Sequence, residues 1–151
     1  AGVKVGVTRT TQIPTRWIDQ GASEALIIAE TPYRQAAGLI EIKLKNYISD
    51  RTNWRKMLQN NLVEDDLYEL RNELISFVDD ELIQYMKKSE QVTHLKFPVL
   101  RYPEKVKSVG LDKCPLIEEK LVGVKGQYLL FDNDTVFNIR KHTGYLVELS
   151  F

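Results

Sequence analysis

The chain has 151 residues, of which 43% are hydrophobic and 28% are charged, so it can bury one core and is typical of a globular protein. Its formal net charge is zero, which excludes a global field toward nucleic acid or an anionic membrane and leaves only local basic patches. A single cysteine, Cys114, excludes an internal disulfide, and no apolar run approaches the roughly 20 residues of a membrane span. We therefore expect a cytoplasmic protein without a membrane partner.

The first predicted element is a strand over residues 3–7. Val3, Val5 and Val7 alternate on one face, and Gly6 lies near its end. A strand this close to the first residue needs a pairing partner, and no earlier residue supplies one. We therefore expect the sequence to be a fragment whose upstream strand is missing.

A short helix is predicted next. Pro14 suits its first turn, Trp17 and Ile18 give it an apolar side, and Gly21 is a natural C-terminal stop. The apolar run 25–29 follows and is typical of a short buried strand.

A second helix is predicted to begin with Thr31 as N-cap and to end near residues 49–50. At 100° per residue, Glu41 lies about 70° from the centre of its apolar face, on the shoulder of that face. Lys45 follows at i+4, so an ordinary helix ion pair is one interpretation of Glu41. The buried face is predicted to consist of Tyr33, Ala37, Ile40, Leu44, Tyr47 and Ile48.

The segment 51–57 is basic and contains an aromatic residue. Arg51, Arg55 and Lys56 surround Trp54, an arrangement that suits contacts with a nucleic-acid backbone. A solvated helix end with the tryptophan as a core anchor is the alternative.

A long helix of about six turns is predicted next. Asn61 and Glu64 have the spacing of a capping box, and an apolar stripe continues to Tyr85. Acidic residues in its first turns and lysines at its end interact favourably with the helix dipole.

After Thr93 the apolar pattern changes to short β-type runs. The residues 132–134 are a turn signal between two of these runs, and 101–118 is predicted to be a long surface connection. Four or five strands with tight turns favour a small antiparallel sheet or a partly closed barrel. The predicted strands are 95–99, 121–124, 128–131, 136–139 and 145–149.

The order of these elements resembles the GIY-YIG nuclease superfamily. The resemblance rests on Lys4-Val5-Gly6 in a strand, Arg16-Trp17 in a short helix and Glu41 in the next helix, and it is closest to viral-type variants with Lys-x-Gly at the second motif. It implies an α+β fold whose small antiparallel sheet has flanking helices. We expect a GIY-YIG-like module at 1–57, a long connecting helix at 58–93 and a β-rich subdomain at 94–151.

The resemblance also implies phosphodiester hydrolysis with Mg²⁺ or Mn²⁺. Glu41 would be the metal ligand, Arg16 would bind the scissile phosphate, and Gly6 would let the backbone approach closely. Lys4 stands where the superfamily has a tyrosine and would bind phosphate as a point charge. The expected partner is nucleic acid, DNA rather than RNA, and the sequence indicates no oligomeric state.

Nearly the whole chain also resembles a bacterial family of unknown function. Residues 12–22 and 124–128 carry this resemblance. Members of that family have a cysteine-rich segment upstream, so zinc is expected only in a preceding segment.

Two other classes of function remain open. The chain can be a non-catalytic nucleic-acid-binding module that keeps the basic residues, or a protein-interaction module in which Glu41 is structural. The first needs a continuous basic surface, and the second needs an exposed apolar patch on the β region.

Overall fold

The structure is a computed structural model that describes residues 2–151. Its helices are α1 (Thr15–Asp19), α2 (Arg34–Leu44), α3 (Trp54–Leu58), α4 (Leu67–Ile75), α5 (Asp80–Ile83) and two 3₁₀-helices, η1 (Thr10–Gln12) and η2 (Ile139–His142). Its strands are β1 (Glu24–Ala25), β2 (Thr93–His94), β3 (Lys107–Val109), β4 (Leu121–Lys125), β5 (Tyr128–Phe131) and β6 (Thr135–Asn138). The predicted α+β class is confirmed.

The strands form two separate sheets. Strands β1 and β2 pair antiparallel, and the other four have the order β3-β6-β5-β4. Strand β3 runs parallel to β6, whereas β6, β5 and β4 form an antiparallel meander. The larger sheet is open at β3 and β4, so the C-terminal part is a small sheet and not a closed barrel.

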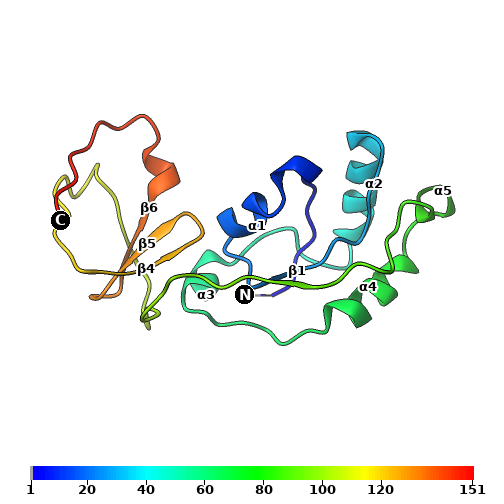
Figure 1. The fold of residues 1–151 in the computed structure, drawn as a ribbon, viewed down its shortest axis with the longest axis horizontal. Coiled ribbons are helices and arrows are strands. Elements are labelled where there is room, and N and C mark those ends of the chain that lie inside the picture. Colours follow the sequence, from blue (N-terminus) through cyan, green and yellow to red (C-terminus); the bar gives the residue numbers. More distant parts are fainter. Residues whose placement is uncertain (1) are drawn as a thin grey trace.

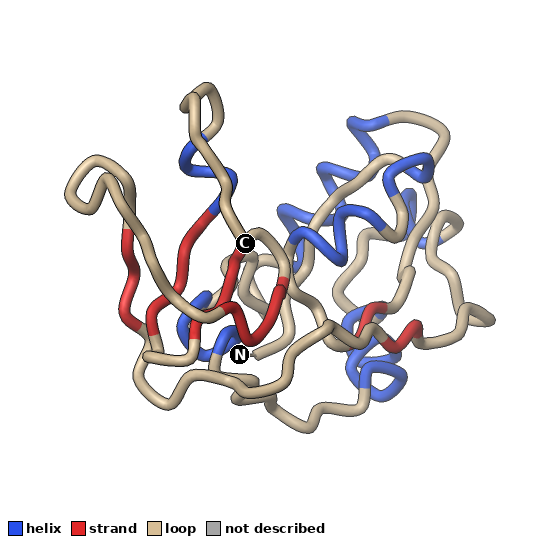
Figure 2. Tube along the Cα trace, turned by 60° about the vertical axis from the view of Figure 1, so that its left-hand side comes forward, coloured by secondary structure: helices blue, strands red, loops and turns tan. Residues whose placement is uncertain are grey.

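The larger sheet and most of the helical part lie at opposite ends of the molecule (Figure 1). The four-stranded sheet lies at one end, helices α2, α4 and α5 lie at the other, and α1 and α3 lie between them. Figure 2 shows the same separation of the strands of the larger sheet from most of the helices. Among the described residues, no helix is both long and apolar enough to cross a membrane.

Two groups of buried side chains form the interior. The first core joins α3 to the larger sheet and consists of Met57, Leu58, Val122, Leu130 and Val136. The second core joins α2 to α4 and the segment after it and consists of Ile40, Leu44, Leu74 and Val78. The predicted boundary after residue 57 therefore falls inside the first core, and the division into three parts stays a prediction.

The end of α1 is closed by a glycine, as predicted. Gly21 has a φ of 67°, its N–H donates to Ile18 at 2.9 Å, and the N–H of Ala22 donates to Trp17 at 3.1 Å. This pair of hydrogen bonds is a Schellman motif, which satisfies the last carbonyls of the helix.

The turn between β4 and β5 packs against this same helix end. Gly126 has a φ of 59°, and a Cβ there would lie 3.0 Å from the Asp19 carbonyl oxygen and 3.2 Å from the Gly21 nitrogen. Both atoms belong to the backbone and cannot move aside easily, so the close approach requires glycine at residue 126.

The predicted strand at residues 3–7 is wrong. Lys4 forms a single parallel bridge with Ser49, in which the Val5 N–H donates to the Ser49 carbonyl at 3.0 Å. The segment that follows α2 therefore pairs with the N-terminal residues. The helix predicted from Thr31 also begins later, at Arg34.

The predicted six-turn helix is wrong as well, because the structure divides it into α4 and α5. Asp66, not Asn61, is the first N-cap, and its carboxylate accepts from the N–H groups of Tyr68 at 2.8 Å and Glu69 at 3.3 Å. Asp79 precedes α5. Aspartate and serine favour helix ends, and Ser76–Asp79 breaks the helix although the apolar spacing continues through Phe77 and Val78.

The Asp66 cap gives a first prediction. Asp66→Ala should lower the free energy of unfolding by about 1 kcal/mol, because two amide groups of α4 lose their acceptor. Urea unfolding followed by circular dichroism measures this change. Glu64→Ala, which removes a nearby exposed carboxylate that makes no cap, is the control. Equal losses in the two variants would contradict the capping role.

The C-terminal predictions are partly confirmed. Strands β4, β5 and β6 lie where the sequence predicts them, and β6 follows the predicted 132–134 turn. The segment 145–149 forms no strand, and 95–99 contributes only a bridge between Val99 and Gly123. Strand β3 lies inside the predicted surface connection, where three residues in a parallel pair leave little signal in the sequence.

Candidate functional site

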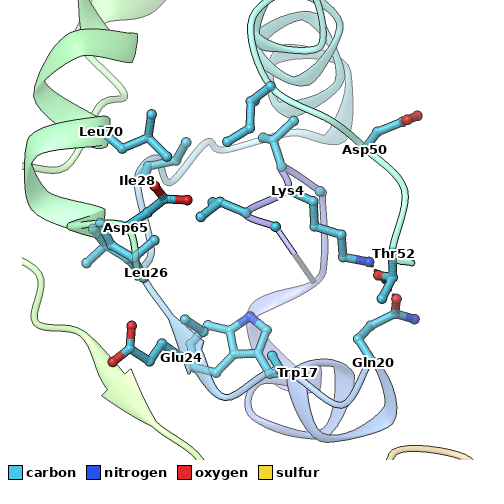
Figure 3. A pocket seen from close by; sticks show the side chains of 18 of the residues that line it. Lys4, Trp17, Gln20, Glu24, Leu26, Ile28, Asp50, Thr52, Asp65 and Leu70 are labelled. Carbon is cyan, nitrogen blue, oxygen red and sulfur yellow. Dashed lines mark hydrogen bonds between the residues drawn. The ribbon is translucent and has the colours of Figure 1, made fainter. Parts of the chain in front are cut away.

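A cavity of about 510 Å³ lies between the N-terminal segment, α1, the start of β1, α2 and α4 (Figure 3). We call it the first cavity. Lys4, Gly6, Arg16 and Glu41, the four residues that the nuclease resemblance singled out, all line it. The four residues come from three segments of the chain, namely the N-terminal segment, α1 and α2, and all of them border this one cavity.

The Lys4 ammonium lies at one side of the first cavity. It donates to Oε1 of Gln20 at 2.6 Å, and Figure 3 shows it beside Thr52. Burial lowers the pKa of Lys4, the positive charge of Arg16 lowers it further, and the negative charge of Asp50 partly opposes them. Two cations therefore share this side of the cavity closely enough to repel each other.

The guanidinium of Arg16 supplies the second of these charges. It is half-buried, and within residues 2–151 it makes no hydrogen bond or ion pair. An arginine without a carboxylate partner, beside a lysine, favours an anion between the two.

An unsatisfied hydroxyl lies on the same side. Oγ1 of Thr52 is buried and has no hydrogen-bond partner among the described residues. Buried hydroxyls are nearly always hydrogen-bonded, and an unpaired one indicates a missing partner. This oxygen is enclosed by protein, so a ligand in the first cavity would reach it only after the threonine side chain turns.

Glu41 lines the first cavity from α2. Its nearest ion-pair contact is Lys45 at 3.9 Å, and its side chain keeps 24% of its surface exposed. Lys45 contacts Asp50 more closely, at 3.2 Å, and this hydrogen bond is the main cause that lowers the pKa of Asp50. Lys45 is therefore engaged mainly by Asp50, and the Glu41 carboxylate remains accessible to a ligand.

Gly6 faces open space. A Cβ built there would meet nothing within 4 Å, so the protein itself imposes no need for glycine at this position. The predicted role of Gly6, a close approach of backbone to phosphate, depends on the ligand.

Glu41 is the lining residue that was predicted to hold a magnesium or manganese ion. Mg²⁺ is commonly held by one or two carboxylates, with water and substrate phosphates completing its shell, and Glu41 provides such a carboxylate. The described residues contain no group of three or more histidine, cysteine or acidic side chains placed to hold a metal. An ion here would therefore depend on Glu41 and on the substrate.

The basic side chains of the predicted segment 51–57 do not line the first cavity, although Thr52 and Met57 of the same segment do. Arg51, Trp54, Arg55 and Lys56 are not among the residues that line the first cavity. The Trp54 ring stacks on Tyr128 at 5.7 Å, and the guanidinium of Arg55 lies 4.3 Å from the Trp54 ring. Trp54 thus packs at the edge of the first core, whereas the three basic residues remain exposed, and their contact with nucleic acid stays a prediction.

Several lining residues were missed from the sequence. Gln20 and Thr52 carry no pattern of their own, and Asp65 stood out only as part of an acidic helix start. Figure 3 shows Asp65 pointing into the cavity from the side opposite Lys4. Lys125, which is buried but does not line the first cavity, was also missed; it interrupts the apolar run of β4 just before Gly126, and this interruption was its one available signal.

Comparison with known proteins gives a family but no relative of established activity. The chain matches none of the curated proteins or solved structures with which it was compared. The profile of one family, described as a protein of unknown function (DUF2797), matches residues 1–147. The chain therefore belongs to the DUF2797 family.

Proposed function

We propose that the protein is a divalent-metal-dependent phosphodiester hydrolase of nucleic acid, or a close relative of one. The observation that carries the proposal is that Lys4, Arg16 and Glu41 line one cavity of about 510 Å³. Within residues 2–151 neither Arg16 nor Lys4 forms an ion pair with a carboxylate, and these two positive charges support an oxyanion as the ligand. DNA is the first substrate to test.

Each residue has a role that its chemistry permits. The planar fork of Arg16 can donate two hydrogen bonds to non-bridging phosphate oxygens, and Lys4 adds a point charge on the same side. Glu41 would hold Mg²⁺ or Mn²⁺, which when bound acts as a Lewis acid on the phosphate oxygens.

A cleavage assay on the full chain tests the proposal. The purified protein is incubated with single- and double-stranded DNA and RNA, with Mg²⁺, with Mn²⁺ or with a chelator. We expect the protein to cleave at least one of these substrates, and we expect the chelator to abolish that cleavage. Arg16→Lys, which keeps the charge but loses the planar fork, should slow this cleavage about tenfold.

The other outcomes are equally informative. Salt-sensitive binding without cleavage under any metal condition would favour the non-catalytic nucleic-acid-binding module. The absence of both binding and cleavage would overturn the proposal.

A protein-interaction module is the second candidate. Large apolar side chains of the C-terminal segment lie open to solvent, with Leu146 and Phe151 fully exposed and Leu149 80% exposed. An accumulation of exposed apolar residues supports a protein partner for this segment.

A further inference from the structure

A second cavity, of about 280 Å³, adjoins the first and shares Ser23 and Leu62 with it. Its remaining lining residues are Asn60, Leu95, Lys96, Phe97, Tyr102 and Lys125. None of the lining residues is acidic and two are lysines, and half of the lining residues are leucine or aromatic. The second cavity thus combines apolar surface with positive charge.

Lys125 is the most unusual group in this cavity. It ends β4 and is 1% exposed, and its ammonium donates to Oδ1 of Asn60 at 2.9 Å. The ammonium lies 5.1 Å from the Tyr102 ring centre and 5.6 Å from that of Phe97. Asn60 itself has a φ of 54°, a conformation that asparagine tolerates better than most residues.

The charge of Lys125 has no counter-charge. Within residues 2–151 it makes no ion pair, and burial lowers its pKa to about 8. A buried ammonium without an anion is costly, and an apolar residue of similar length would fill the same space at lower cost. Asn60 occupies one of its three donors, so two N–H groups remain for another acceptor.

The rings of Phe97 and Tyr102 indicate the chemistry of the rest of a ligand that carries such an acceptor. Both line the cavity and both lie near the Lys125 ammonium. Aromatic faces stack on planar rings, and the leucine side chains favour an apolar body. The volume is below that of most drug-sized pockets, which begin at roughly 300 Å³. A small ligand therefore fits.

We propose that the second cavity binds a small aromatic anion, with its carboxylate or phosphate on Lys125 and its ring against Phe97 and Tyr102. Lys96 adds a second positive charge to the same wall. This site does not require that the first cavity hydrolyse nucleic acid, since none of Lys4, Arg16 and Glu41 lines it.

Titration calorimetry with the full chain tests this site. Benzoate and phenyl phosphate are the two anionic probes, and benzamide is the neutral match of benzoate. We expect saturable binding of at least one anion at pH 7 and at least about tenfold weaker binding of benzamide. If benzoate binds and phenyl phosphate does not, the ligand is a carboxylate, and the reverse result identifies a phosphate.

Variants locate the binding. Lys125→Met should weaken the anion by at least about tenfold, whereas Lys120→Met, which removes an exposed lysine just before β4, should not. Phe97→Leu should weaken binding of the anion without changing the charge of the second cavity. Amide chemical shifts measured by NMR should move at Asn60 and Lys125 and not at Lys4, Arg16 and Glu41, which line only the first cavity. Thermal melts verify that each variant is folded.

The pH dependence gives a separate readout. The titratable groups that line the cavity are Lys96, Tyr102 and Lys125, and burial raises the pKa of Tyr102 while it lowers that of Lys125. Above pH 8 the free protein must take up a proton on Lys125 to bind the anion, so affinity should fall by up to about tenfold per pH unit. Failure of both anions to bind, or equal binding by Lys125→Met, would overturn the proposal.

Discussion

Glu41→Gln should slow metal-dependent cleavage by at least about 100-fold, because the substitution removes the carboxylate that would hold the ion while it keeps the shape of the side chain. The rate is measured with the best substrate from the cleavage assay over a range of Mn²⁺ and Mg²⁺ concentrations. Binding of the nucleic acid in the presence of a chelator should be unchanged, since Arg16 and Lys4 remain. The effect should therefore fall on the catalysed step.

A matched control separates this role from that of the helix ion pair. Lys45→Gln breaks the same 3.9 Å contact with Glu41 and also the 3.2 Å contact with Asp50, but it leaves the Glu41 carboxylate in place. A structural Glu41 would make the two variants equally slow, whereas a metal ligand would leave Lys45→Gln nearly as active as the wild type. Equal rates in Glu41→Gln and the wild type would remove Glu41 from the mechanism.

Leu58→Ala should lower the free energy of unfolding by about 2–5 kcal/mol. Leu58 is fully buried at the end of α3, where it packs with Val122, Leu130 and Val136 of the larger sheet. Shortening it leaves a cavity that rigid strands on one side cannot fill. Urea unfolding followed by circular dichroism and by tryptophan fluorescence gives the value.

Leu100→Ala is the control for this substitution. Leu100 is 90% exposed and lies beside the same sheet, where its N–H donates to Val122, so its truncation should change stability by no more than about 0.5 kcal/mol. Similar losses in the two variants would show that Leu58 does not anchor α3 to the sheet.

Local patterns predicted the elements that local chemistry determines. Strands β4, β5 and β6 combine β-type runs with a polar turn at 132–134, and Gly21 closes α1 through its own left-handed backbone. The prediction of one long helix was wrong for the opposite reason. The periodicity of Phe77 and Val78 is that of a helix, whereas the break depends on competition for backbone hydrogen bonds at Ser76–Asp79.

The site was less accessible from the sequence. A resemblance, not a pattern, suggested that Lys4, Arg16 and Glu41 belong together, and the structure places them on one cavity. Thr52 and Lys125 show why the rest was missed. A threonine hydroxyl or a lysine ammonium is ordinarily exposed, and its burial here results from the approach of distant segments that no local spacing records.

The contact of Gly126 with the end of α1 connects the larger sheet to the N-terminal part of the chain. Arg16 and Trp17 belong to a helix of five residues, which is too short to hold its own direction in water. The turn at Gly126, more than a hundred positions later, packs against the end of this helix and fixes its direction. Residues 1–57 made separately would lack this contact, and the Arg16 guanidinium would not be held in one orientation. The orientation of Arg16 in α1 therefore depends on the packing of the larger sheet against the end of that helix.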